Sequence, residues 1–209
     1  MMKRTLQIII ITALALGMSG ISAAENTPIE AIRSTVDAVL DIMKDKELAA
    51  PGRRAERREK IRALIRDRFD FREMSRRSLA RHWKKLSPEE EREFVAVFSD
   101  LLESSYIGKI EAYTDEKVTY DKETIRGKGK YGIVNTTIVT KNVDIPIDYK
   151  LIFRNGKWWI YDVVIEGVSF ISTYRSQYNK IIVKQSFAKL LERMKSKLKE
   201  IKAMEAKEA

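Results

Sequence analysis

The chain has 209 residues, no cysteine, one histidine and a formal charge of +10 at pH 7. The absence of cysteine excludes a disulfide framework, so the fold depends on packing alone. A single histidine excludes paired-histidine and histidine-cluster metal sites, and the length suits one compact domain.

The chain begins with a segment that has the order of an export signal. Residues 1–4 are basic, Leu6 to Ile21 is mostly apolar, and Ser22-Ala23-Ala24 supplies small residues. This order predicts a secretory signal peptide, residues 1–24, cleaved after Ala24. An uncleaved anchor would need about 20 apolar residues, and this run is shorter and interrupted by glycine. We therefore expect an exported, periplasmic protein whose mature chain, residues 25–209, is a single domain with a charge of +8.

The mature chain to about residue 112 predicts helices. Thr27-Pro28-Ile29-Glu30 and Ser87-Pro88-Glu89-Glu90 each combine an N-cap, a proline at the first helical position and a capping-box glutamate. Asp70-Phe71-Arg72-Glu73 predicts a further capping box, and residues 53–68 predict a helix with seven arginines. Apolar residues recur at helical spacing in the first and last of these helices, so each has an apolar face.

Residues from about 116 to 165 predict an antiparallel sheet. Val118–Tyr120, about Glu123–Arg126 and Ile133–Thr140 read as separate strands rich in Thr, Ile and Val. Asn155-Gly156 predicts a type I′ turn between two longer strands, Ile145–Phe153 and Trp158–Ile165. Because side chains alternate along a strand, the turn sets four cross-strand pairs on one mostly apolar face: Phe153 with Trp158, Leu151 with Ile160, Tyr149 with Asp162, and Ile147 with Val164.

The helical period returns after Gly167, so helices are predicted over about 169–205. Ser186 is the expected cap of the last helix, and we expect the tail to fray from about Lys202. Helices, then an antiparallel sheet, then helices predict an α+β fold.

Two motifs have ordinary structural interpretations. Gly127-Lys128-Gly129-Lys130-Tyr131-Gly132 matches G-x-G-x-x-G, but a strand-like segment follows where a dinucleotide site needs a helix. These glycines therefore predict a turn or bulge. His82 has no partners marked by a motif and is expected to be a half-buried helix residue, so we predict no cofactor and no metal.

Two charged features leave alternatives open. Asp162 on an apolar face predicts a satisfied buried carboxylate, the alternative being a catalytic acid or base in a cone-shaped pocket. The basic helix over 53–68 predicts a solvated face or a docking surface for an acidic partner or anionic lipid. Nucleic acid is a poor partner for an exported chain that lacks interleaved aromatic residues.

The chain contains Trp159-x-Tyr161-Asp162-Val163-x-x-Glu166-Gly167-Val168-Ser169, continuing into Tyr174-Arg175-Ser176-Gln177-Tyr178. This pattern resembles a periplasmic family, the phospholipid-shuttle component of the Mla (maintenance of lipid asymmetry) pathway, also called the toluene-tolerance auxiliary family. The resemblance covers the mature chain, including the Phe69-Asp70-Phe71 region and the Trp83 to Phe98 stretch.

The resemblance implies a curved antiparallel sheet wrapped by helices that encloses an apolar lipid pocket. It implies a soluble, non-enzymatic periplasmic carrier, a monomer, that moves phospholipid between an outer-membrane lipoprotein complex and an inner-membrane ABC lipid transporter. The apolar faces then suggest nine lipid-binding residues: Phe98, Leu102, Tyr149, Leu151, Phe153, Trp158, Ile160, Val164 and Val168.

Three alternatives accompany this hypothesis. The cargo could be a hopanoid-type lipid, or the pocket could belong to a small enzyme that uses Asp162 on an apolar substrate. The chain could also be an interaction module that docks through its basic helix.

Overall fold

The computed structural model describes residues 27–50, 52–112 and 117–208. The predicted signal peptide and its cleavage site lie outside these residues. The elements in chain order are α1 (Pro28–Lys44), α2 (Arg54–Arg68), α3 (Phe71–Leu79), the 3₁₀ helix η1 (Ala80–Lys85), α4 (Pro88–Glu111), β1 (Lys117–Arg126), β2 (Tyr131–Val139), β3 (Asp144–Arg154), β4 (Lys157–Ile165), β5 (Val168–Ser169), α5 (Phe170–Lys184) and α6 (Phe187–Glu208).

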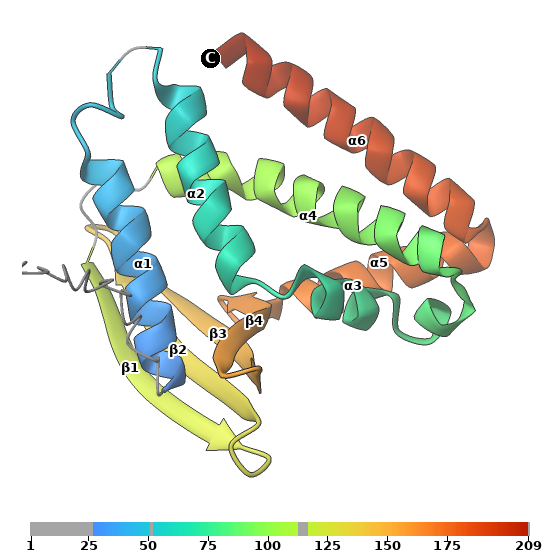
Figure 1. The fold of residues 1–209 in the computed structure, drawn as a ribbon, viewed down its shortest axis with the longest axis horizontal. Coiled ribbons are helices and arrows are strands. Elements are labelled where there is room, and N and C mark those ends of the chain that lie inside the picture. The colour runs from blue at the N-terminus through green and yellow to red at the C-terminus, as the bar shows by residue number, and fades with distance from the viewer. Residues whose placement is uncertain (1–26, 51, 113–116, 209) are drawn as a thin grey trace, which may run out of the picture.

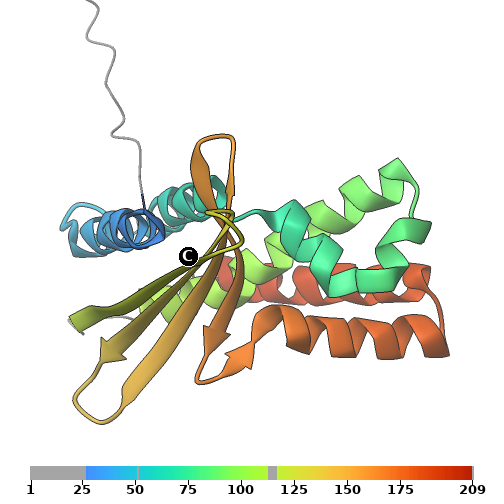
Figure 2. The same cartoon turned by 90° about the horizontal axis from the view of Figure 1, so that it is seen from below.

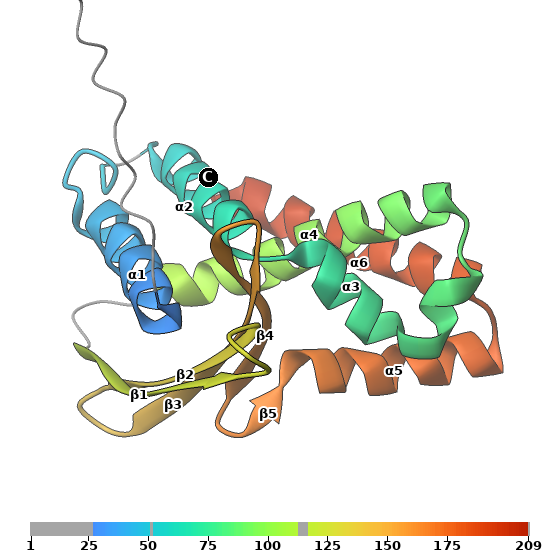
Figure 3. The ribbon, with the colours of Figure 1, turned by 60° about the horizontal axis from the view of Figure 1, so that its bottom comes forward.

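The strands form one antiparallel sheet in the order β1-β2-β3-β4-β5. Figure 1 shows α1 crossing one face of the curved sheet, and Figure 3 shows α1 and α2 together above it. Figure 2 shows α4, α5 and α6 extending away from the sheet to one side. The predicted α+β fold, a curved antiparallel sheet wrapped by helices, is confirmed.

The helix starts follow their capping residues. Thr27 and Ser87 form complete capping boxes with Glu30 and Glu90, each followed by a proline. The Asp70 side chain accepts a hydrogen bond from the Glu73 backbone N–H, but the Glu73 carboxylate binds arginines instead of capping the helix in return. Short polar side chains therefore fix where these helices begin.

The glycine-rich motif is a turn, as predicted. Gly127, Lys128 and Gly129 have φ values of 61°, 55° and 87° and join β1 to β2. Gly132 has a different role, because a Cβ there would lie 2.6 Å from Pro28 Cγ. Its missing side chain lets the start of α1 pack directly on the sheet.

The two short strands predicted before this turn are one strand. The pairing of β1 with β2 shifts between Tyr120 and Lys122, so Asp121 is the extra residue of a β-bulge. The hydroxyls of Thr119 and Thr137 donate to the Asp121 carboxylate at 2.8 and 2.7 Å. These hydrogen bonds stabilise the bulge within a single strand, where the sequence pattern predicted two separate strands.

The β3–β4 register agrees with the prediction only near the turn. Phe153 pairs with Trp158 and Leu151 with Ile160, but the next pair is Lys150 with Asp162. Tyr161 is therefore an extra residue in β4, and the predicted pairs of Tyr149 with Asp162 and Ile147 with Val164 are wrong. Beyond Tyr161 every β4 side chain faces the opposite side from the one predicted.

The end of α6 also differs from the prediction. The segment from Lys202, expected to fray, continues the helix to Glu208. Lys202 Nζ lies 2.7 Å from Asp100, and Arg62 binds Glu205 at 2.9 Å. Contacts with α4 and α2 thus stabilise a segment whose own sequence is weakly patterned.

Two apolar clusters make up the core of the described chain. One joins α3, α4, α5 and α6 around Phe94, Phe98 and Tyr178, with aromatic centroids 5.6 to 6.1 Å apart. The other joins α1 to the sheet through Ile32 and Leu151. The second cluster adjoins an apolar cavity, which its members Ile32 and Ile160 line.

Candidate functional site

The apolar cavity lies between α1, the sheet and the last turns of α4, with a volume of about 310 Å³. This volume is at the lower end of the range of about 300–1,000 Å³ that is usual for small-molecule sites. Its walls are mainly aliphatic and aromatic side chains from α1, α2, α4 and four strands. The cavity therefore offers a contiguous apolar surface to a ligand.

The first wall of the apolar cavity is α1. Its stripe of Ile32, Val36, Val39, Leu40 and Met43 points toward the sheet, because residues three and four apart share one helix face. This stripe was visible in the sequence, but nothing in the sequence showed that it faced the sheet.

The N-terminal end of α1 is attached to β1 by polar contacts. The Ile29 backbone N–H donates to Glu123 Oε2 at 2.7 Å, and the Arg33 guanidinium lies 4.1 Å from the Tyr120 ring centroid. Within the described residues no backbone–backbone hydrogen bond joins α1 to the sheet. Each of these described contacts between α1 and the sheet therefore involves at least one side chain.

The opposite wall is the concave face of the sheet. Ile147 and Tyr149 of β3 and Ile160 and Ile165 of β4 line the cavity. Ile160 and Ile165 could not share a face in a regular strand, because they are five residues apart. The bulge at Tyr161 brings them to the same side.

The polar groups in the walls are mostly bonded to the protein itself. Thr136 Oγ1 donates to the Ile147 carbonyl at 2.8 Å, and Thr35 Oγ1 donates to Ala31 O at 2.9 Å. Burial raises the pKa of Tyr149 to about 12, so its side chain stays neutral at physiological pH. Among the described lining residues the one charged side chain is exposed Lys109, whose Nζ lies 4.9 Å from the Tyr106 ring centroid.

The structure distributes the nine predicted lipid-binding residues over several environments. Tyr149 and Ile160 line the apolar cavity. Leu151 and Trp158 are buried in the core cluster beside it. The other five residues neither line the cavity nor belong to that cluster. Phe98 and Leu102 belong to the helical cluster, and Val164 is buried outside both clusters. Phe153 and Val168 are 41% and 60% exposed.

These outcomes have physical reasons. Val164 turns away from the cavity because of the bulge, and Phe153 and Val168 lie at strand ends beyond the helices. Phe98 and Leu102 lie on the α4 face toward α5 and α6, whereas only the last turns of α4 reach the cavity.

Asp162 is a satisfied carboxylate on the far side of the sheet. Oδ2 accepts from Ser169 Oγ at 2.7 Å and lies 3.0 Å from Lys150 Nζ, and Oδ1 accepts from the Ile171 backbone N–H at 3.1 Å. Asp162 thus connects β4 to the first turn of α5, and it is not in the lining of the apolar cavity. The expectation of a satisfied carboxylate is confirmed, but the predicted cross-strand pair of Asp162 with Tyr149 is wrong.

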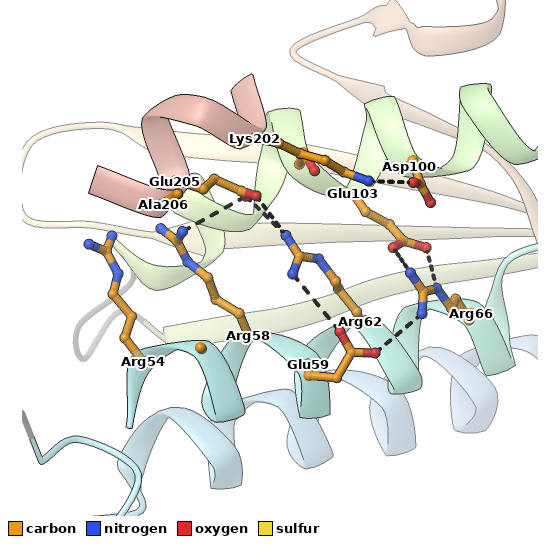
Figure 4. Close-up of a pocket in the computed structure, with 12 residues that line it drawn as sticks. Arg54, Arg58, Glu59, Arg62, Arg66, Asp100, Glu103, Lys202, Glu205 and Ala206 are labelled. Carbon is orange, nitrogen blue, oxygen red and sulfur yellow. Dashed lines mark hydrogen bonds and ion pairs between the residues drawn. The ribbon is translucent and has the colours of Figure 1, made fainter. Parts of the chain in front are cut away.

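The arginines of α2 form a ladder directed at α4 and α6 (Figure 4). Arg54, Arg57 and Arg58 all bind Glu111, at 2.8 to 3.1 Å. Arg66 binds Glu103 at 2.7 Å. The charged groove that the ladder borders has a volume of about 410 Å³. The predicted solvated face is therefore largely engaged in ion pairs within the protein.

Two features are absent from the described residues. No helix there combines the length and apolar character needed to cross a membrane. No group of three or more His, Asp or Glu side chains in that part of the chain could hold a metal ion.

These features define a small α+β protein with an apolar cavity between a helix and a curved sheet. A family model described as MlaC protein matches residues 33–196. The chain belongs to the MlaC family, as the resemblance of its sequence implied.

Two individual proteins are similar to the chain. Over 120 residues it is 26% identical to the intermembrane phospholipid transport system binding protein MlaC of Haemophilus influenzae. That match covers 56% of each protein, so it spans about half the length of the curated relative. A solved structure, the phospholipid-binding protein from Ralstonia solanacearum in complex with a phospholipid, has a TM-score of 0.73 and 22% identity, over 84% of this chain and 98% of that one. At this identity the likeness shows a shared fold.

Proposed function

We propose that this protein is a non-catalytic carrier that binds a phospholipid by its acyl chains in the apolar cavity. It would carry the lipid through the periplasm, as a monomer, between an outer-membrane lipoprotein complex and an inner-membrane ABC lipid transporter. The observation that carries the proposal is the cavity itself, whose wall stripes from α1 and the sheet are apolar and whose described charge is confined to exposed Lys109. Family membership and the lipid named with the Ralstonia structure support it.

The energetics explain why such a cavity is needed. A diacyl lipid has on the order of 28 chain methylenes, and each costs about 0.8 kcal/mol to expose to water. Transfer through water would therefore cost on the order of 20 kcal/mol without a shield. Apolar walls lower this cost without any catalytic group.

The volume of the apolar cavity adds a mechanical requirement. About 310 Å³ is small for two full acyl chains, so the walls must separate as the lipid enters. One wall that can move is α1, because no described backbone–backbone hydrogen bond joins it to the sheet.

The test is native mass spectrometry of mature protein purified from a bacterial host, combined with thermal unfolding. Val39→Trp and Ile138→Trp add bulk to opposite walls of the cavity, and Ile125→Trp is the control because Ile125 is 47% exposed and outside the lining. We expect the wild type and the control to carry one lipid, and both cavity variants to lose most of it with little change in Tm.

An empty wild-type protein, or cavity variants with full occupancy, would contradict the carrier proposal. Chemical analysis of the released lipid separates a phospholipid from a hopanoid cargo. The intact mass of the same material tests export, since cleavage after Ala24 leaves Glu25 as the first residue.

A further inference from the structure

A second groove lies between η1 and α5, with a volume of about 430 Å³. Its lining includes Arg81 and His82 on one side and Ser172, Arg175, Ser176 and Asn179 on the other. None of its lining residues belongs to the apolar cavity. Figures 1 and 3 show this part of the molecule at the opposite end from α1 and β1.

The chain around this groove contains no acidic residue over two long stretches. Residues 74–88 and 167–191 lack both Asp and Glu. The two stretches meet in space at the groove. Residues 79–82, at the end of α3 and in η1, line one side of it, and residues of α5 line the other. They carry nine basic side chains: Arg76, Arg77, Arg81, Lys84, Lys85, Arg175, Lys180, Lys184 and Lys189.

Most of these cations have no acidic partner among the described residues. Arg76 and Arg77 bind Glu73, and Lys189 binds Glu192. No ion pair within that part of the chain involves the six others, which are Arg81, Lys84, Lys85, Arg175, Lys180 and Lys184. Their charge is directed to solvent.

The polar groups in the groove lining favour an acceptor ligand. Asn179 Oδ1 lies 3.0 Å from Arg81 Nη2 and 2.9 Å from His82 Nε2, so its carbonyl oxygen is engaged. The other end of the Asn179 amide is a donor, and Arg81 and Arg175 are donors with no acceptor lone pair. Guanidinium groups bind carboxylates in a planar, two-point geometry.

We propose that the η1–α5 groove and the basic surface around it dock an acidic segment of a protein partner. The cations give long-range attraction, and the recessed donors receive individual Asp or Glu side chains. A flat anionic membrane fits less well, because the groove is concave and Val183 is the one large, strongly exposed apolar side chain of α5. The proposal is independent of lipid binding, since the groove and the apolar cavity share no residue.

The probe is a fluorescein-labelled decaglutamate peptide, titrated with the full mature protein at two salt concentrations. Arg81→Glu/Arg175→Glu should weaken binding by about tenfold or more and reduce its salt dependence. The matched control, Lys46→Glu/Lys122→Glu, makes the same change of net charge at exposed positions outside the groove. We expect this control to weaken binding by less than about twofold, because salt screens distant charges.

A second variant distinguishes the contribution of the groove's shape to peptide binding from that of its charge. Ser176→Trp fills the groove without changing charge, and it should also weaken the peptide complex, by about fivefold, as expected when a contact pocket is blocked. Tm and co-purified lipid should stay at wild-type values in all three variants, so a failure here is distinct from a failure of the carrier proposal.

Four outcomes would overturn the proposal. The first is no binding of the peptide to the wild type, and the second is an equal loss in the control. The third is full binding by Ser176→Trp. The fourth is a protein that does not bind the peptide but prefers phosphatidylglycerol vesicles to phosphatidylcholine vesicles. In that outcome the preference would be lost in Arg81→Glu/Arg175→Glu.

Discussion

Two regions of this protein are rich in basic residues but differ in environment: residues 53–68, and residues 74–88 together with 167–191. The α2 arginines bind carboxylates of α4 and α6, such as Glu103, Glu111 and Glu205, which lie 37 to 143 residues away in the chain. The η1–α5 surface has a similar number of basic side chains, but the lining of its groove contains no carboxylate. A cluster of cations therefore has a structural role where the fold supplies acidic partners, and it is available for binding where the fold does not.

The largest expected effect is at the centre of the ladder. The side chain of Glu111 is 5% exposed and binds three arginines, so Glu111→Gln removes the negative charge that the three share. We expect a loss of about 3 kcal/mol in the free energy of unfolding, measured by urea denaturation. The control Glu192→Gln removes a surface pair and should leave Tm unchanged within error.

The effect of Glu111→Gln should depend on pH. Burial raises the pKa of Glu111, but hydrogen bonds from Arg58, Arg54 and Arg57 outweigh it and hold the pKa at about 2, below the ordinary 4.5. The carboxylate therefore stabilises the fold above about pH 4.5 and loses this effect as the pH falls toward 2. The difference between wild type and variant should shrink over that window, and a constant difference would contradict the assignment.

Arg66→Met tests the other end of the ladder, with an expected loss of about 2 kcal/mol, since it leaves a buried carboxylate unpaired. Burial already raises the pKa of Glu103, against the influence of Arg66, and removing the arginine raises it further. A carboxyl with a raised pKa costs stability as the pH rises through that value. The deficit should therefore be largest at alkaline pH and shrink toward acidic pH, as measured by urea denaturation across pH.

A buried carboxylate outside the ladder sharpens the comparison. Asp162 binds Lys150, Ser169 and the Ile171 N–H, and Asn can retain part of this network. We expect Asp162→Asn to cost about 1 kcal/mol and to leave bound lipid intact. Loss of an assayable turnover at unchanged stability would instead favour the enzyme alternative.

The smallest expected effect is on the η1–α5 surface. Arg81→Ala/Arg175→Ala should change the free energy of unfolding by less than about 0.5 kcal/mol, the usual range for surface sites. The matched ladder change, Arg58→Ala/Arg66→Ala, should cost several times more. Equal costs for the two double variants would remove the distinction between the two regions.

Much of the fold was predictable because its signals are local. Two capping boxes, the glycine turn at 127–129 and the Asn155-Gly156 hairpin each depend on a few adjacent residues. The structure places these features where the sequence indicated. The course of the chain over 202–208 was not predictable, because distant side chains such as Asp100 hold that segment.

The candidate site was less predictable. The residues predicted to line the pocket lie on the sheet and α4, and only Tyr149 and Ile160 of them line the apolar cavity. The stripe of α1 was not predicted as a wall, because periodicity identifies an apolar face without showing what that face contacts. The bulge at Tyr161 was not predicted either, since an extra residue in a strand leaves no mark in the composition.

That bulge decides which side of the sheet the residues after it face. Deleting Tyr161 alone would remove the bulge without changing these sides, because Asp162 would still pair with Lys150 and Val163 with Tyr149. Regular pairing that kept Tyr161 would instead turn Asp162 and Val164 toward the apolar cavity and Val163 and Ile165 away from it. The extra residue thus keeps a carboxylate out of the apolar walls and within reach of Ser169 and the Ile171 N–H at the start of α5.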